Sequence, residues 1–527
     1  MSENDRPTGV SRRRFLTSTA ALTLASGIAR RAKAQPAASG PFTRMSVNDP
    51  NAPAMLASYR TAISALLALP MKDGRNFYRN AIVHLLDCPH GNWWFLPWHR
   101  GYLGWWEQTI RKYSGNANFA FPYWDWTAQP YVPDAFWQGT LNPSNAAFFQ
   151  NANDFINAIT PAMTTFYGGL TTAQKSQLLQ RSYVSNLPTF LSTARSSFAR
   201  PARSLTPQNP NLDSFTRQTV SIQTIQSALA TPYFAGGGMY PRGGFGSDIA
   251  AQHSGGSSKG ILESQPHDNV HGNIGGFMGR FLSPIDPIFM AHHANIDRLW
   301  SVWTQLQQQA GKPTTPTGDE LTNWNKEPFL FYFNSAGTSV SPSTSQNYTN
   351  IGAFNYIYTR GSGAPATAGR ESVEPRAAAE SVRRVSGTVT SSDMAISKAA
   401  VAKVSLPGTA SREAATPSHV VAHITVEPPP DPTNVRFHVF VNPPEDELAL
   451  DSNHPSYAGT IQFFGEHHHD GAGTTFSVPL DDTLSDQRGA GTLRSDQLNI
   501  LVVPQTRGVA MRDVPNARVT NVEITAF

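Results

Sequence analysis

The eleven tryptophans of this 527-residue chain all lie between Trp93 and Trp324, and none follows. Large aromatic side chains supply much of the apolar area that a core buries, so the chain divides into an aromatic-rich part and a part built from smaller residues. A length of 527 residues allows about three domains. Apolar residues make up 39% and charged residues 15%, which favours a large buried core over disorder.

Helical spacing of apolar residues dominates the aromatic-rich part. The spacing predicts helices over 55–70, 77–87 and 102–113. The Asp-Pro pair at 286–287 places a capping residue before a proline and opens a further helix over 288–303. We therefore expect a mainly α, helical-bundle domain over residues 35–360.

The remaining part reads as a linker followed by strands. Residues 361–417 are rich in Ala, Ser, Gly and Arg, which is typical of an exposed linker that grades into strands. In the run 435–441, Val435, Phe437, Val439 and Val441 would share one face. Six such runs predict a small antiparallel β-sandwich over 418–527: His419–Glu427, Val435–Asn442, Thr460–Phe464, Thr475–Leu480, Leu498–Val503 and Arg518–Phe527.

The positive charge of the chain is concentrated at its start. Residues 1–34 hold seven Lys or Arg residues and two acidic ones, whereas the whole chain has a net charge of only +4. The remainder is therefore close to neutral and has no basic stripe. This distribution excludes an electrostatic reason to expect nucleic acid or an anionic membrane as a partner.

The first 34 residues have the order of an export signal. A paired arginine in 11–16 precedes a mildly apolar stretch, 17–29, and an A-x-A cleavage site at 32–34. This order resembles a twin-arginine signal, so we expect a leader over 1–34 that the twin-arginine export machinery reads. The destination would be the periplasm or the medium. We expect no membrane span, because no apolar run approaches the roughly 20 residues that one needs.

Histidines form two groups in the helical part. His267 and His271 are spaced i, i+4 and would project from one face of a helix, although a single such pair is common by chance. Sets of three neutral imidazoles suit copper better than calcium or magnesium, which prefer oxygen ligands. Two copper ions facing each other could bind O2 between them as peroxide, each Cu(I) supplying one electron. The groups are His84, His90 and His99, then His267, His271, His292 and His293.

Three sequence motifs carry a family resemblance. The stretches "HLLDCPHGNWWFLPWHR" and "DPIFMAHHANIDRLW" are similar to the copper-binding regions of the tyrosinase family, which includes catechol oxidases and molluscan haemocyanins. "PYWDW" at 122–126 is a further landmark, and the resemblance covers roughly residues 45–360. It implies one copper on His84, His90 and His99 and a second on His267, His271 and His293, with His292 as a neighbouring or structural residue.

Cys88 is the single cysteine, so an internal disulfide is excluded. It stands two residues before His90, as in the C-x-H pattern of fungal tyrosinases and haemocyanins. The resemblance implies a thioether between Cys88 and the ring of His90. The alternative is a buried free thiol.

Other residues near the predicted ligands acquire roles only through the resemblance. Glu263 would hold a water or deprotonate a phenol, or it is a solvated carboxylate at a helix start. Asp268 stands where many phenol-hydroxylating members have Asn, and it would assist deprotonation or accept a ligand N–H. Phe281 resembles an aromatic gate over the second copper, or it belongs to the core.

Tyr356 and Tyr358 resemble the Y-x-Y element that closes the tyrosinase core. Many relatives then carry a β-domain that covers the copper entrance, so we expect residues 418–527 to be a lid. Phe463 or Phe464 would plug the site, although an aromatic residue on a strand is more often core.

The resemblance implies a type-3 copper oxidase that uses O2 to hydroxylate monophenols at the ortho position, to oxidise o-diphenols to o-quinones, or both. Phenolic small molecules and O2 would be its substrates. A catechol oxidase without hydroxylase activity and a haemocyanin-like reversible O2 carrier use the same ligands. A zinc hydrolase is a further alternative, because the H-D-N-V-H at 267–271 resembles H-E-x-x-H.

Overall fold

The computed structural model of the chain describes thirteen stretches, and the expected leader, residues 1–34, lies outside them. They are residues 40–180, 184–238, 240–251, 253, 258–364, 383–387, 400–405, 419–429, 432–444, 450–465, 473–493, 497–506 and 517–526. Among these residues, no helix is both long and apolar enough to cross a lipid bilayer.

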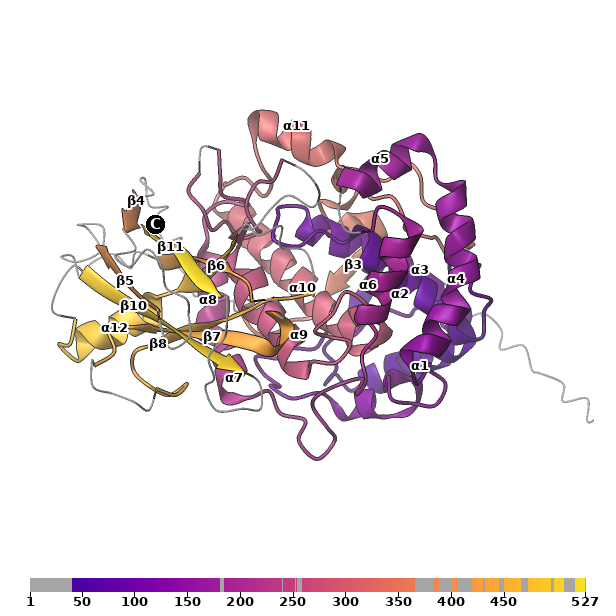
Figure 1. Cartoon of the computed structure of the whole chain (residues 1–527), viewed down its shortest axis with the longest axis horizontal. Helices are drawn as coiled ribbons and strands as arrows, with labels where there is room; N and C mark the ends of the chain where they lie inside the picture. Colours follow the sequence, from indigo (N-terminus) through magenta and orange to yellow (C-terminus); the bar gives the residue numbers. More distant parts are fainter. Residues whose placement is uncertain are drawn as a thin grey trace, which may run out of the picture. The chain divides into compact units, whose positions relative to one another are not determined.

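Helices dominate the first part of the chain, as the apolar spacing predicts (Figure 1). The second predicted helix matches α2 from end to end, and the prediction over 288–303 falls within α10. The helices are α1 Ala52–Leu67, α2 Phe77–Asp87, α3 Phe95–Ser114, α4 Ala152–Gly169, α5 Thr172–Gln180, α6 Leu187–Ser196, α7 Ser214–Thr219, α8 Ile222–Ala230, α9 Asp268–Ile274, α10 Ile288–Gln309, α11 Gly318–Lys326 and α12 Asp481–Gly489.

Local capping interactions place the helices that matter for the site. The Asn76 side chain accepts hydrogen bonds from the backbone N–H groups of Tyr78 and Arg79, at 2.9 and 3.3 Å, and so begins α2. Asp286 Oδ1 accepts the N–H of Ile288 at 3.2 Å and begins α10. Each capping group satisfies backbone donors that the first turn of a helix leaves unpaired.

A buried polar cluster attaches the end of the helical part to α10. Asp297 of α10 accepts hydrogen bonds from the hydroxyls of Tyr356 and Tyr358, the two tyrosines of the Y-x-Y element. Its carboxylate also pairs with Arg100 Nε at 2.7 Å and with Arg44 Nη1 at 3.1 Å. Strand β1 (Phe42–Arg44) pairs in parallel with β3 (Tyr356–Tyr358) beside this cluster. The chain before α1 and the chain after α11 therefore hold the same helix.

Two packed sheets form the C-terminal part, which confirms the predicted β-sandwich. One sheet has the order β5-β10-β7-β8, and the other has the order β2-β9-β6-β11-β4. All pairs are antiparallel except β2 with β9, which is parallel. The strands are β2 Ser258–Lys259, β4 Arg383–Gly387, β5 Ala400–Ser405, β6 Val420–Glu427, β7 Val435–Val441, β8 Tyr457–Gln462, β9 Thr474–Pro479, β10 Gln497–Thr506 and β11 Arg518–Ala526.

Two features of these sheets differ from the expected domain limits. Strands β4 and β5 lie inside 361–417, so part of the expected linker belongs to the sandwich. Strand β2 comes from the helical part, yet it forms the edge of the second sheet. The sequence gives no sign of β2, because two residues are too few for an alternating pattern.

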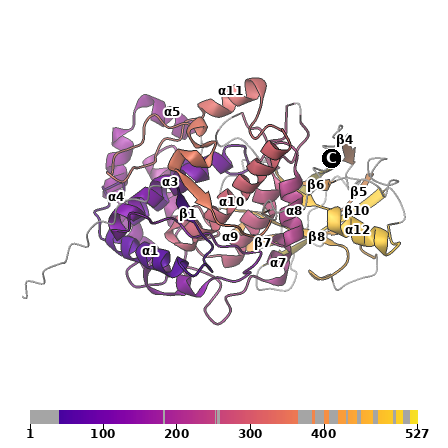
Figure 2. The ribbon, with the colours of Figure 1, turned by 180° about the vertical axis from the view of Figure 1, so that it is seen from behind.

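Strand β7 is buried on both faces, and the second face explains how the two parts meet. Val435, Phe437, Val439 and Val441 contribute to the sandwich core, as the alternation predicts. On the opposite face the ring of His438 stacks on Phe215 of α7, with ring centroids 3.6 Å apart. Contacts of α9 with β8 and of α10 with α3 place α9 and α10 between the N-terminal helices and the strands (Figures 1 and 2).

Candidate metal centre

Two groups of side chains could each hold a metal ion, and within each group the ligand atoms lie within 4.8 Å of one another. Their histidines are buried apart from His90, which is half-buried. The first group is His84, Cys88, His90 and His99, and the second is His267, His271, His292 and His293. The structure thus brings together all seven histidines of the two groups seen in the sequence.

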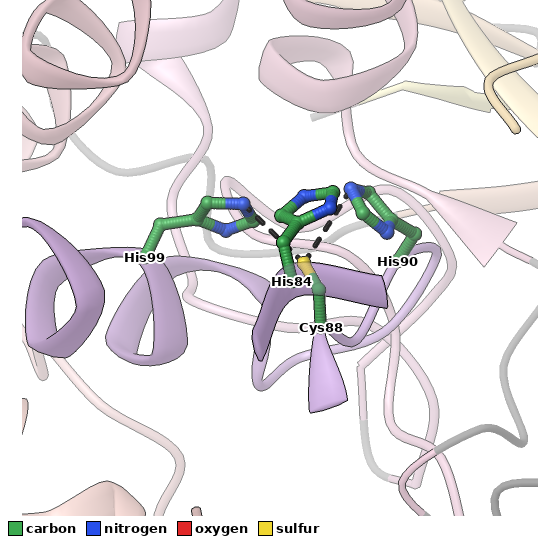
Figure 3. A group of neighbouring side chains, drawn as sticks. All are labelled: His84, Cys88, His90 and His99. Atoms are coloured by element: carbon green, nitrogen blue, oxygen red, sulfur yellow. Dashed lines mark hydrogen bonds between the residues drawn. The ribbon is translucent and has the colours of Figure 1, made fainter. Parts of the chain in front are cut away.

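The first group is built from two helices and the loop between them (Figure 3). Helix α2 supplies His84 and α3 supplies His99, while Cys88 and His90 lie in the connecting loop. Gly91 has a φ of +69°, a conformation that favours glycine, and so allows the chain to turn immediately after His90. The sulfur of Cys88 lies 3.7 Å from His90 Nε2 and 3.4 Å from His99 Nε2.

The second group lies on a distorted helix and on α10. A π-helical turn over Glu263–His267 leads directly into α9, which carries His271. The ring centroids of His267 and His271 are 4.5 Å apart. Single π turns are frequent at functional sites, because the wider turn re-aims the side chains that it carries. Helix α10 supplies the adjacent pair, His292 and His293.

The two groups face each other and form a single site. The rings of His99 and His293 are stacked, with centroids 4.1 Å apart and planes 6° apart. His90 of the first group lies 5.7 Å from His267 of the second, measured between ring centroids. Ions held by the two groups would therefore be neighbours.

In four of the histidine rings, a hydrogen bond at Nδ1 determines which of the two ring nitrogens can bind a metal. Three of these Nδ1 atoms contact a backbone carbonyl oxygen, which can only accept a hydrogen bond. The fourth contacts a carboxylate oxygen of Asp268. The proton therefore belongs on Nδ1, and the lone pair of Nε2 is left for a metal. Nε2 of His84 and Nε2 of His267 have no hydrogen-bond partner among the described residues. The Nδ1 contacts are His84 with Phe281 O at 2.8 Å, His99 with Phe95 O at 2.8 Å, His271 with Met278 O at 2.5 Å and His267 with Asp268 Oδ1 at 2.8 Å.

His292 differs from these rings in its tautomer. The indole N–H of Trp126, the last residue of the "PYWDW" motif, donates to Nδ1 of His292 at 3.0 Å. A neutral His292 must then carry its proton on Nε2, so that neither nitrogen has a lone pair to offer a metal. Nδ1 of His293 has no hydrogen-bond partner in the part of the chain that the structure describes, and its Nε2 lies 3.2 Å from Nε2 of His271.

Burial keeps these imidazoles neutral, which is the form that binds metals. It lowers the pKa of His84 and of His271 to about 3. It also lowers the pKa of His90, His99, His267 and His293 well below the ordinary value. Copper and zinc bind neutral nitrogen ligands of this kind, whereas calcium and magnesium prefer oxygen ligands.

Two buried carboxylates lie beside the histidines and share one lysine. Glu263 accepts hydrogen bonds from the Gly91 N–H at 2.7 Å and from the Ser247 hydroxyl. Asp268 accepts from Lys259 Nζ at 2.6 Å, and burial raises its pKa to about 7 although Lys259 opposes this. Lys259 Nζ also lies 3.8 Å from Glu263 Oε1. Lys259 was not singled out in the sequence, because its contact with Asp268 depends on β2.

Aromatic rings enclose the site, and one of them comes from the C-terminal part. The ring centroid of Phe464 lies 4.5 Å from that of His271, 4.6 Å from that of His90 and 5.6 Å from that of Phe281. Phe463 is not at the site. Its ring packs against Phe437 and Phe476 inside the β-sandwich, because adjacent residues of an extended chain point to opposite sides.

Two further rings at the site were not singled out in the sequence. The ring centroid of Phe95 is 4.8 Å from that of His267, and the centroid of Phe289 is 4.1 Å from that of His293. Each lies four residues before a histidine on the same helix, so that helical spacing could have indicated them.

Comparison with known proteins identifies the two parts separately. Residues 59–306 match the family model described as the common central domain of tyrosinase. Residues 372–522 match a domain of unknown function, DUF7868. The second match begins within the expected linker, in agreement with β4 and β5 being strands of the sandwich.

Similar proteins come from plants and bacteria. Polyphenol oxidase II, chloroplastic, of Ipomoea batatas is 25% identical over 53% of this chain and 43% of its own length. Tyrosinase HcTyr1 of Hahella sp. (strain CCB-MM4) is 26% identical over 80% of each chain. A solved structure of recombinantly expressed latent aurone synthase (polyphenol oxidase) has a TM-score of 0.58 at 19% identity, covering 93% of this chain and 90% of that one. This chain spans less than half the length of the plant relative.

Proposed function

This chain belongs to the tyrosinase family, whose centres hold two copper ions, and on that premise we propose that it is a polyphenol oxidase that uses O2 to oxidise phenols. The observation that carries the proposal is the pair of facing histidine groups, which offer neutral imidazole nitrogens from α2, α3, α9 and α10. When bound, two coppers would supply the two-electron redox chemistry that links O2 to a phenol. The protein supplies ligands, orientation and an enclosure that excludes water.

The proposed ligands are His84, His90 and His99 for one copper and His267, His271 and His293 for the other. The tautomer of His292 supports its omission, because Trp126 occupies Nδ1 and the proton then lies on Nε2. We assign His292 a structural role next to the second copper. The same geometry argues against a zinc hydrolase, since the two groups face each other and a hydrolase of the H-E-x-x-H kind uses a single ion.

We propose that o-diphenol oxidation is the basic activity and that monophenol hydroxylation also occurs. A monophenol must lose its hydroxyl proton before it can bind as a phenolate, and Glu263 or Asp268 would accept that proton. Glu263 contacts the backbone of the loop that carries His90, and Asp268 contacts the ring of His267. Both carboxylates therefore lie next to ligand-bearing segments. Phe281 would line the same enclosure, since its carbonyl holds His84 and its ring contacts Phe464.

The C-terminal domain is proposed to be a lid, with Phe464 as its plug. Phe464 packs with the core of the helical part, whereas Phe463 packs with the core of the sandwich. Polar contacts lie beneath the lid: Asn269 Nδ2 donates to Thr460 O at 2.9 Å, and Ser264 Oγ donates to Ser477 O at 2.6 Å. Polar contacts can be exchanged for water, so a lid held in this way can be displaced.

Two predictions from the sequence stay proposals. A thioether between Cys88 and His90 is supported by the sulfur lying 3.7 Å from the ring nitrogen, although His99 is closer. Mass spectrometry after copper loading in air should then show a chain mass that is lower by two hydrogens. Export by the twin-arginine machinery rests on residues 1–34, which lie outside the described residues.

The experiment that tests the proposed function combines metal analysis with oxygen uptake. Full-length chain loaded with copper should hold two coppers and should consume O2 with a catechol, more so after limited proteolysis or mild detergent displaces the lid. A monophenol, assayed in parallel, reports hydroxylation. Fewer than two coppers would refute the dicopper proposal, and oxygen binding without quinone formation after lid displacement would indicate an O2 carrier.

A further inference from the structure

Lys259 is a buried cation that joins the copper site to the C-terminal domain. It is 5% exposed, and its ammonium group lies 2.6 Å from Asp268 Oδ2 and 3.8 Å from Glu263 Oε1. The other oxygen of Asp268 contacts Nδ1 of His267 at 2.8 Å. A chain of direct contacts therefore runs from Lys259 through Asp268 to a proposed copper ligand.

The C-terminal domain helps to hold Lys259 in this place. Lys259 is in β2, which pairs in parallel with β9, opposite Phe476. The hydroxyl of Ser477 donates to the carbonyl oxygen of Lys259 at 2.7 Å. The Lys259 ammonium group also lies 5.5 Å from the centroid of the Phe476 ring, within range of a cation–π contact. Backbone and side chain of Lys259 are thus both in contact with the domain proposed as the lid.

We propose that Lys259 is a positioning residue through which the C-terminal domain acts on the second copper. While β9 extends its sheet with β2, Lys259 holds the Asp268 carboxylate against His267, so that Nε2 of His267 faces the metal. Displacing the lid then changes two things, since it uncovers the entrance and also loosens the support of one ligand. This inference rests on the proposed dicopper function.

Loss of the lysine tests the first half of the proposal. Partners that orient a metal-binding histidine are worth about 10–100-fold in metal affinity, so K259M should release one of its two coppers to a chelator roughly 10–100 times faster. The other copper should be released at the wild-type rate. K259R should restore retention in part, because it keeps a cation beside Asp268. Lys403→Met, an exposed lysine on β5, is the control and should match the wild type.

A double variant separates positioning from simple charge balance. K259M leaves two buried carboxylates without a cation and could unfold the chain, whereas K259M/D268N removes one charge of each sign. The asparagine Oδ1 can still accept from His267, but nothing holds it there. We expect the double variant to unfold at a temperature near that of the wild type and still to lose one copper faster. Wild-type copper retention in this variant would overturn the proposal.

The contribution of the lid is tested in the full-length chain at Ser477. S477A removes the hydrogen bond to the Lys259 carbonyl and should speed the release of the same copper, with no further effect when combined with K259M. Ser477 Oγ also contacts His423 Nδ1 at 3.0 Å, so T525A, which removes the hydrogen bond at Nε2 of His423, is the matched control. Additive effects of S477A and K259M would overturn the coupling. A wild type with fewer than two coppers would instead refute the proposed function.

Discussion

The ring centroid of Phe464 lies 4.6 Å from that of His90, although Phe464 follows β8 in the C-terminal domain and His90 lies in the loop after α2. The same ring lies 4.5 Å from His271 of the second histidine group. One side chain of the C-terminal domain thus contacts both groups. A phenol that approaches the site from this side would meet the phenyl ring first.

Replacing Phe464 with alanine should therefore activate the full-length chain. We expect F464A to raise catechol oxidation by roughly tenfold or more without proteolysis, because the site would open while the lid stays folded. F463L is the matched control. It should lower the free energy of unfolding by up to about 1.5 kcal/mol, because it changes the sandwich core, and it should leave the catechol oxidation rate of the full-length chain nearly unchanged. Equal rates for F464A and wild type would show that the plug is elsewhere.

Gly272 permits the close approach of β8 to α9. A Cβ atom at this position would lie 2.5 Å from Cγ of Gln462, so G272A should lift β8 from the helix. The expected result is a higher catechol oxidation rate than in wild type. Shortening the opposing residue in G272A/Q462A should remove the collision and restore the low rate. If the double variant is as active as G272A, the effect arises within the histidine site rather than at the lid.

The ion pair between Asp213 and Arg436 should make docking of the domains sensitive to acid. Their contact is 2.5 Å, and Arg436 lowers the pKa of Asp213 against the opposing effect of burial. A carboxylate with a lowered pKa stabilises the folded state above its ordinary pKa, and this contribution disappears as the pH falls through the lowered value. Thermal unfolding of R436M should show a loss of about 1 kcal/mol at pH 7, and this loss should disappear as the pH falls through the lowered pKa of Asp213. A loss that persists in acid would show that Arg436 stabilises by packing instead.

His292 and His293 should respond differently to removal. H293A should hold about one copper per chain, since it lacks a ligand of the second ion. H292A should keep two coppers, because Trp126 already withdraws His292 from metal binding. Metal analysis after dialysis distinguishes the two variants. Loss of copper from H292A, with retention in H293A, would reverse the assignment.

Glu263 should matter for monophenols more than for catechols. E263Q keeps an oxygen that can accept from Gly91 but cannot take up a proton, so monophenol hydroxylation should fall by about 10²-fold. Catechol oxidation should change only a few-fold, measured as quinone formation on the same preparation with the lid displaced. A parallel loss of both activities would indicate that Glu263 only supports the loop that carries His90.

Local patterns in the sequence were sufficient for most of the secondary structure. The helix over 77–87 and the alternation of 435–441 agree with α2 and β7, because helix and strand periods depend on neighbours a few residues apart. The two histidine groups were equally visible, since the spacing of His267 and His271 and the loop from His84 to His99 are local. Their family motifs indicated copper before any distance was known.

Long-range packing decided what the local patterns left open. Phe463 and Phe464 are equivalent in the sequence, and only the docking of the sandwich sends one ring to its own core and the other to the histidines. Likewise, the hydrogen bond from the Trp126 indole withdraws His292, but not His293, from metal binding. The pairing of β9 with β2 brings Lys259 to Asp268. Such contacts join residues far apart in the chain, so they depend on how finished elements pack rather than on the periodicity that forms them.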